Sequence, residues 1–234
     1  MPRITDVVKN LLFINVIVFF ARMTLPQFVP ELSMFSPLSA NFQPYQLVTH
    51  FFMHANPQHL IFNMLTLFFL GPMVEQTIGA KRFLILYLLS ALGAFIAHFG
   101  VDYYTYQSLI GQIDPADFVT IRESGRELIL QGRNYSDPRL GAMNALLNIP
   151  IVGASGAIYG VVIAFATLHP NARLMLLFPP IPIKAKYLAF ILLGIDLFSG
   201  ISNTSSGIAH FAHLGGALVG FLLIRYWYKG RKFS

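Results

Sequence analysis

Six apolar segments, separated by polar or proline-containing stretches, set the main constraint on what this chain can fold into. A helix that crosses a bilayer needs about 20 mostly apolar residues, and only helices and closed barrels satisfy their backbone polar groups inside lipid. We therefore expect an all-α polytopic membrane protein built as a six-transmembrane-helix bundle. The expected spans are roughly 10–24, 59–78, 83–101, 155–169, 187–201 and 207–224.

The composition agrees with a membrane protein. Charged residues make up 11% of the chain and hydrophobic residues 55%, whereas soluble domains carry about 25% charged residues. If the amino terminus faces inward, eleven Lys and Arg residues lie on the inner side and five on the outer side. Basic residues favour the cytoplasmic side of a membrane. We therefore interpret the net charge of +6 as orientation in a lipid bilayer, with both termini cytoplasmic, and expect no nucleic-acid partner.

The chain contains no cysteine, which excludes disulfides, thiolate metal sites and a cysteine nucleophile. The first apolar segment is not followed by a clear small-residue cleavage site, so we expect no cleaved signal peptide. No internal repeat and no second domain are evident. We expect a single transmembrane domain over 1–234, in a bacterial inner membrane.

Two outer segments interrupt the alternation of spans and turns. The first, about 24–58, is rich in proline yet full of Phe, Leu and Met, which is typical of a segment lying in the membrane interface. The second, about 102–150, is a long outer loop. Asp114 followed by proline predicts the start of a surface helix there, and we expect Gly125 to interrupt that helix.

The stretch "GASGAIYG", residues 153–160, places Ser155 at the start of the short fourth span. Gly153 precedes it, so we expect irregular backbone just before the helix begins. Free N–H groups and the positive end of the helix dipole gather at a helix amino terminus, and such groups stabilise an oxyanion. These features indicate a nucleophilic serine, provided that a base lies nearby.

The last span, "AHFAHLGGALVGF", supplies the candidate base. His210 and His213 are three residues apart and share a helix face. Gly216 in this span and Gly156 in the serine helix are each followed, four residues later, by another glycine. Small residues at this spacing let membrane helices approach closely. If these faces meet, Ser155 and His213 lie at the same end of the contact.

The same residues also allow a purely structural interpretation. Serine and glycine often serve helix packing in membranes, so the serine stretch alone would more often be structural than catalytic. A histidine within a span is more informative, because ionisable groups there are costly and usually functional. The combination favours a catalytic pair over either feature taken alone.

A second polar cluster lies in "HANPQHLIFN". His59 and Asn63 are four residues apart on one helix face, and both can donate hydrogen bonds to a developing oxyanion. A metal site formed by His50, His54 and His59 is the alternative. Their spacing does not match the helical H-E-x-x-H arrangement, so we favour an oxyanion hole.

The quoted stretches resemble, in their order and placement, those of the rhomboid family of intramembrane serine proteases. The resemblance runs from the first outer loop to the sixth span. It implies an intramembrane serine endopeptidase that cleaves transmembrane substrates near their outer ends. It also implies a Ser155–His213 dyad without an acid, and no metal or cofactor.

The resemblance further assigns supporting roles. Tyr159 would pack on the catalytic imidazole. His59, Asn63 and the Ser155 backbone N–H would form the oxyanion hole. Glu75 would be a structural glutamate at the inner end of the second span.

Some residues depart from the family pattern or are left without a role. Many members carry a Trp-Arg pair in the first loop, where Tyr45 and Gln46 stand here. For His210 we expect an orienting hydrogen bond, and for Asp196, in the fifth span, an internal hydrogen bond or a cavity contact.

Two other functions remain open. A non-catalytic relative that binds membrane helices would have lost the serine or the histidine, and this chain keeps both. A transporter would show broken helices in two related halves, and no such symmetry is evident.

Overall fold

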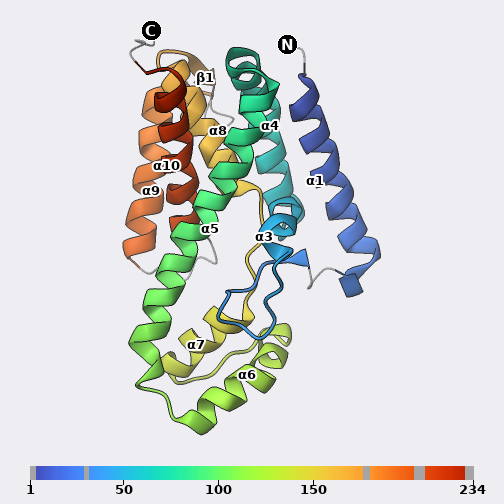
Figure 1. Cartoon of the computed structure of the whole chain (residues 1–234), viewed down its shortest axis with the longest axis vertical. Helices are drawn as coiled ribbons and strands as arrows, with labels where there is room; N and C mark the ends of the chain where they lie inside the picture. The colour runs from blue at the N-terminus through green and yellow to red at the C-terminus, as the bar shows by residue number, and fades with distance from the viewer. Residues whose placement is uncertain (1–3, 29–31, 176–179, 203–208, 230–234) are drawn as a thin grey trace.

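The computed structural model describes residues 4–28, 32–175, 180–202 and 209–229, and these residues are mostly helical (Figure 1). The elements are α1 (Asp6–Thr24), η1 (Pro26–Phe28), α3 (Gln46–Thr49), η2 (His50–Phe52), α4 (Pro57–Ile78), α5 (Ala80–Ile110), α6 (Pro115–Leu130), α7 (Pro138–Asn148), α8 (Ser155–Leu168), β1 (Arg173–Met175), β2 (Pro182–Lys184), α9 (Ala185–Ile201) and α10 (His210–Trp227).

A helix lies in the described part of each of the six predicted spans, and residues 207 and 208 of the last span lie outside the described part of the chain. Within the described residues, α1, α4 and α5 are long and apolar enough to cross a membrane, and α8 is a shorter apolar helix. That all six helices cross a bilayer stays a prediction. Helix α1 begins and helix α10 ends at the same end of the bundle (Figure 1).

Helix α8 lies at the centre of the bundle. Most of its 14 residues are buried, and it packs against α4, α5, α9 and α10. Small side chains explain the close approach, because a Cβ on Gly216 would collide with the carbonyl oxygen of Gly156. A Cβ on Gly156 would in turn collide with the methyl group of Ala94 on α5. The glycine faces of α8 and α10 therefore meet, as their spacing predicts.

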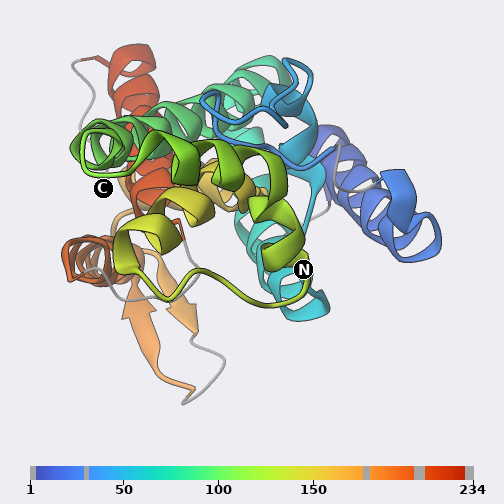
Figure 2. The same ribbon diagram turned by 90° about the horizontal axis from the view of Figure 1, so that it is seen from below.

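Helix α1 lies at the edge of the bundle (Figure 2) and is held by a carboxylate from α4. The Glu75 side chain accepts a hydrogen bond from the Thr5 hydroxyl, and others from the backbone N–H groups of Val7 at 3.4 Å and Val8 at 3.0 Å. An acidic group at a helix amino terminus satisfies free donors and complements the dipole. Glu75 thus has the structural position that the resemblance implies.

The outer segment contains the predicted surface helix but differs from the prediction in other respects. Helix α5 continues to Ile110, about nine residues past the expected end of its span. The surface helix α6 forms, with the Asp114 side chain accepting from the Ala116 N–H at 2.8 Å. However, α6 runs through Gly125 without interruption.

Gly125 is needed for a close contact rather than for a break in the helix. A Cβ there would collide with Asn144 and approach Asn148, both on α7, a helix that was not predicted. The Asp137 side chain caps α7 by accepting from the N–H of Arg139 at 2.8 Å, with proline at the first helical position. That Asp-Pro pair is the signal in the sequence that predicts a helix start.

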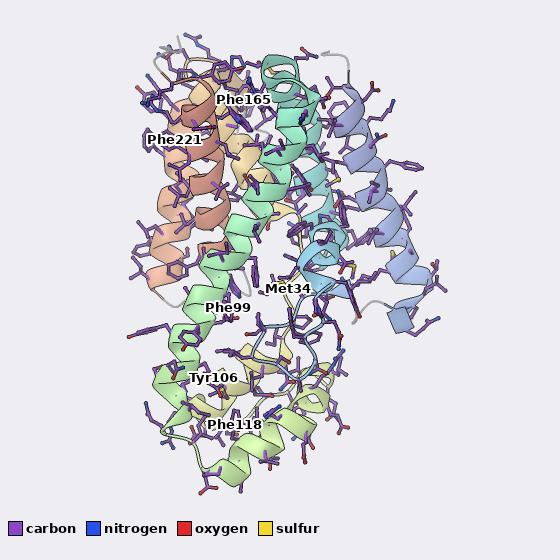
Figure 3. All side chains as sticks on the ribbon, viewed as in Figure 1. Met34, Phe99, Tyr106, Phe118, Phe165 and Phe221 are labelled. Carbon is purple, nitrogen blue, oxygen red and sulfur yellow. The ribbon has the colours of Figure 1, made fainter. Side chains whose placement is uncertain are left out.

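Helices α6 and α7 lie across one end of the bundle (Figure 2) and form a small core of their own with the end of α5. Tyr106 of α5 and Phe118 of α6 face each other there, with ring centroids 6.3 Å apart (Figure 3). The outer segment is therefore a folded unit rather than an irregular loop.

The connection between α8 and α9 also contains unpredicted structure. Strands β1 and β2 pair antiparallel, with Leu174 opposite Ile183. The described residues of this connection contain no helix, as expected, and residues 176–179 lie outside the described part of the chain. Pro182 begins an edge strand, a position that proline tolerates. The chain is accordingly mostly helical and not purely α.

Candidate active site

Ser155 and His213 lie together in the structure. The Ser155 Oγ is 3.0 Å from the His213 Nε2, across the contact between α8 and α10. Ser155 is partly buried at the first position of α8, and His213 is buried near the start of α10. The pairing follows from the facing glycines, which place the two helix starts at one level.

The backbone before Ser155 is shaped by Gly153. Its φ of 127° lies in a region that favours glycine, and a Cβ there would approach the His59 ring at 2.8 Å. The Gly153 N–H donates to the His50 carbonyl oxygen at 3.1 Å, and Met34 and Ile151 exchange backbone hydrogen bonds. The first outer loop thus fixes the segment that presents the serine.

That loop is itself held by Gln46, one of the departures from the family pattern. The Gln46 side chain is buried, and its Oε1 accepts from the N–H groups of Phe35 at 3.3 Å and Gln43 at 3.0 Å. Its Nε2 donates to the Asn41 carbonyl oxygen at 3.3 Å. One amide therefore ties three points of the loop together.

The predicted oxyanion donors face the same space as the serine. The Asn56 side chain caps α4 by accepting a hydrogen bond from the His59 N–H at 2.8 Å. Asn63 lies about one helical turn after His59 on the same helix. His59, Asn63, Ser155 and His213 all line a cavity of about 910 Å³. The Asn63 Nδ2 is buried without a hydrogen-bond partner among the described residues, so this donor is not already used within that part of the chain.

A free α8 amino terminus adds further donors at this point. The first hydrogen bond of the helix runs from the Ile158 N–H to the Ala154 carbonyl oxygen. The N–H groups of residues 155–157 precede that bond, as expected for the first turn of a helix. These backbone dipoles and the Asn63 amide suit a developing negative charge.

Tyr159 stacks on His213, with ring centroids 4.2 Å apart and an interplanar angle of 9°. Tyr159 lies four residues after Ser155, so one face of α8 presents both the serine and the ring that packs on the imidazole. The stack restricts rotation of the imidazole about its side-chain bonds, which keeps Nε2 directed at the hydroxyl.

His54 lies behind His59 rather than in the cavity wall. Its ring is fully buried, both ring nitrogens lack partners among the described residues, and it contacts the His59 ring at a centroid distance of 5.2 Å. Burial lowers the pKa of His54 to about 4, so the ring is neutral at pH 7.

A third polar group at the site was not assigned from the sequence. Asp196 on α9 is buried, and its Oδ1 accepts hydrogen bonds from the Nδ1 atoms of His213 at 3.0 Å and His210 at 2.7 Å. The expectation of an internal hydrogen bond for this residue is confirmed. The resemblance implies a Ser155–His213 dyad without an acid, and this stays a prediction. The structure adds that a carboxylate faces the second ring nitrogen of His213.

The histidines considered for a metal site are not the ones that converge. Within the described part of the chain, His50, His54 and His59 do not form a group of possible metal ligands. Asp196, His210 and His213 are close enough to do so. In that group, His213 already bonds the serine through its second ring nitrogen.

Residues 41–230 match a family model described as the Rhomboid domain. Rhomboid-like protein 12, mitochondrial, of Arabidopsis thaliana is 31% identical over 185 residues, which cover 79% of this chain and 47% of that protein.

Two bacterial proteins are also similar. Rhomboid protease AarA of Providencia stuartii is 26% identical over 171 residues, 73% of this chain and 51% of the relative. Putative rhomboid protease YdcA of Bacillus subtilis is 27% identical over 189 residues, which cover 80% of this chain and 70% of that protein. The chain spans about half the length of the Arabidopsis and Providencia proteins.

Proposed function

Because this chain belongs to the rhomboid family, we propose that it is an intramembrane serine endopeptidase. It would cleave transmembrane segments of other membrane proteins near their outer ends. The observation that carries this proposal is the 3.0 Å contact between the Ser155 hydroxyl and the His213 imidazole, beside a cavity large enough for a peptide segment. Protease names among the relatives support the same activity.

In the proposed reaction, Ser155 Oγ attacks the carbonyl carbon of the substrate while His213 Nε2 takes the hydroxyl proton. The carbonyl oxygen becomes an oxyanion, which the Asn63 amide, His59 and the Ser155 N–H stabilise. His213 then gives the proton to the amine nitrogen as the C–N bond breaks. Water attacks the acyl-enzyme in the same way and restores the serine.

The substrate must present an extended peptide bond at the site. A helical peptide bond is enclosed by the i to i−4 hydrogen bonds of its own helix. Segments with glycine or proline near the outer end of their span unwind at lower cost. We therefore propose that such membrane segments are preferred, and that the chain lies in a membrane with both termini on the cytoplasmic side.

Labelling with a fluorophosphonate tests the proposal. We expect Ser155→Ala to abolish labelling and His213→Ala to slow it by about 10²–10⁴-fold, because the serine then lacks its general base. Ser108→Ala, which removes an exposed hydroxyl from α5, is the matched control and should label like the unmodified chain. A cleavage assay on a transmembrane substrate in detergent or proteoliposomes then tests the reaction.

Equal labelling of all four proteins would contradict the enzymatic function. Tight binding of membrane helices by the unmodified chain, without labelling or cleavage, would instead identify a non-catalytic binder.

A further inference from the structure

We propose that Asp196 is a positioning residue of the active site, and that the chain uses a serine–histidine–aspartate arrangement. This inference rests on the proposed function, since it concerns how His213 acts as the base. It gives α9 a role at the site, because Asp196 is one of the buried residues of that helix.

The hydrogen bonds form one continuous chain. Asp196 Oδ1 is 3.0 Å from His213 Nδ1, and His213 Nε2 is 3.0 Å from Ser155 Oγ. An ionised carboxylate only accepts hydrogen bonds, so the ring proton resides on Nδ1. The lone pair of Nε2 then points at the serine hydroxyl, which is the tautomer that a general base requires.

The carboxylate is itself held in place. His210 Nδ1 donates to the same Oδ1 at 2.7 Å, and 3% of Asp196 is exposed. Its neighbours on α9, such as Ile195 and Leu197, are exposed apolar residues that suit contact with lipid. Asp196 therefore faces inward on an otherwise apolar helix, where a buried carboxylate would be costly without such partners.

The remaining ionisable groups near His213 are consistent with this role. Tyr159 stacks on the His213 ring and lies close enough to the Asp196 carboxylate to interact with it electrostatically. His59 lies across the cavity on α4. Asp196 is the one described carboxylate that bonds the base, so it alone among these groups can accept the Nδ1 proton in a hydrogen bond.

The proton balance of the reaction does not change. The serine proton moves to His213 Nε2 as the Oγ–C bond forms, and the imidazolium that results keeps its Nδ1–H directed at Asp196. The carboxylate stays ionised and gains no proton. It fixes the ring orientation and stabilises the positive charge until Nε2 protonates the leaving amine.

The kinetics of Asp196→Asn test the proposal in the intact chain. An asparagine amide can donate to Nδ1 and thereby favour the other tautomer. We expect kcat to fall by about 10²–10⁴-fold with KM within about threefold, because orientation of the base matters in the transition state and not in binding. The rate of fluorophosphonate labelling should fall with kcat.

Two further variants separate positioning from stability. Asp196→Glu keeps the carboxylate and should recover at least about tenfold of the lost kcat, since an acceptor for Nδ1 is restored. Glu75→Gln is the matched control, because it converts another buried carboxylate to an amide at the far end of α4. It should lower the melting temperature and leave kcat of the folded protein within about threefold.

Several outcomes would overturn the inference. Near-normal kcat in folded Asp196→Asn would do so, as would an Asp196→Glu protein no better than the asparagine variant. If Asp196→Asn does not fold, the same kinetics are measured on Asp196→Ala, which also removes the carboxylate. A kcat of the folded alanine variant within about threefold of that of the unmodified chain would then count against positioning. Loss of activity on adding a chelator would assign the cluster to a metal. Failure of the unmodified chain to label at all would instead reject the proposed function.

Discussion

At the residue scale, the site depends on which hydrogen-bonding groups are already paired and which are free. The His213 imidazole is paired at both nitrogens and stacked on one face, so its orientation is set before a substrate arrives. The Asn63 amide lines the same cavity and has a buried nitrogen without a partner among the described residues. A buried donor of this kind is costly unless a ligand uses it, which suits an oxyanion hole.

Asn63→Ala tests that assignment. We expect kcat to fall by about 10²–10³-fold with little change in KM, because the amide would stabilise charge that develops only in the transition state. Steady-state kinetics on a transmembrane substrate measure both quantities.

Asn15→Ala is the control for Asn63→Ala. Asn15 is another buried asparagine, whose amide donates to the Leu11 carbonyl oxygen within α1 at 2.7 Å. This variant should lose stability and keep its kcat. Equal kcat losses in the two variants would argue for a packing role of Asn63 instead.

At the element scale, the contact between α8 and α10 brings the serine to the histidine. The two helices touch at backbone level, since a Cβ on Gly220 would meet Gly160 just as one on Gly216 would meet Gly156. The membrane offers no strong hydrophobic drive for helices to associate, so close packing and polar contacts hold them together. The distance between the Ser155 hydroxyl and the His213 imidazole therefore depends on the size of a few small residues where the helices cross.

Gly216→Ala should disturb this contact. The added methyl group has no room beside the Gly156 carbonyl, and overpacking of this kind costs about 1–3 kcal/mol. We expect a lower melting temperature in detergent together with slower labelling of Ser155.

Gly194→Ala provides the comparison for Gly216→Ala. A Cβ at Gly194 on α9 meets no atom within 4 Å, so the change should be neutral or add up to about 1 kcal/mol of stability. A Gly216→Ala protein as stable and as reactive as Gly194→Ala would refute the close-packing account.

At the scale of the whole molecule, the two ends of the bundle differ. The start of α1 and the end of α10 share one end, and the unit formed by α6 and α7 covers the other (Figure 1). Residues Leu146 of α7 and Ile151 also line the cavity, so the outer unit reaches the proposed site.

Because the chain lacks cysteine, single cysteines can report which end faces the cytoplasm. Lys229 follows α10, Glu123 lies on α6, and both are exposed. We expect Glu123→Cys to react with a membrane-impermeant maleimide in intact cells or spheroplasts, and Lys229→Cys to react only after lysis, since basic residues favour the inner side. The reverse pattern would show inverted topology, and equal reaction of both before lysis would contradict a membrane-spanning bundle.

What the sequence by itself determined is the position of the six apolar helices and of the surface helix after Asp114, and the identity of their polar groups. Apolar stretches long enough for helices, glycines at four-residue spacing and the helix start at Asp114 are local patterns, and each has a local physical reason. Ser155 and His213 were therefore predicted to meet, because both lie at the starts of helices whose small-residue faces match.

The tertiary structure alone decided what the sequence spacing does not encode. Asp196 was expected inside the bundle, but its partners depend on the rotation and depth of α9 relative to α10, which packing between distant segments sets. The same reason explains Gly125, which weakens a helix locally yet serves here to dock α6 against α7. A carboxylate facing the base is thus a consequence of how the helices pack, and no spacing along the chain relates position 196 to position 213.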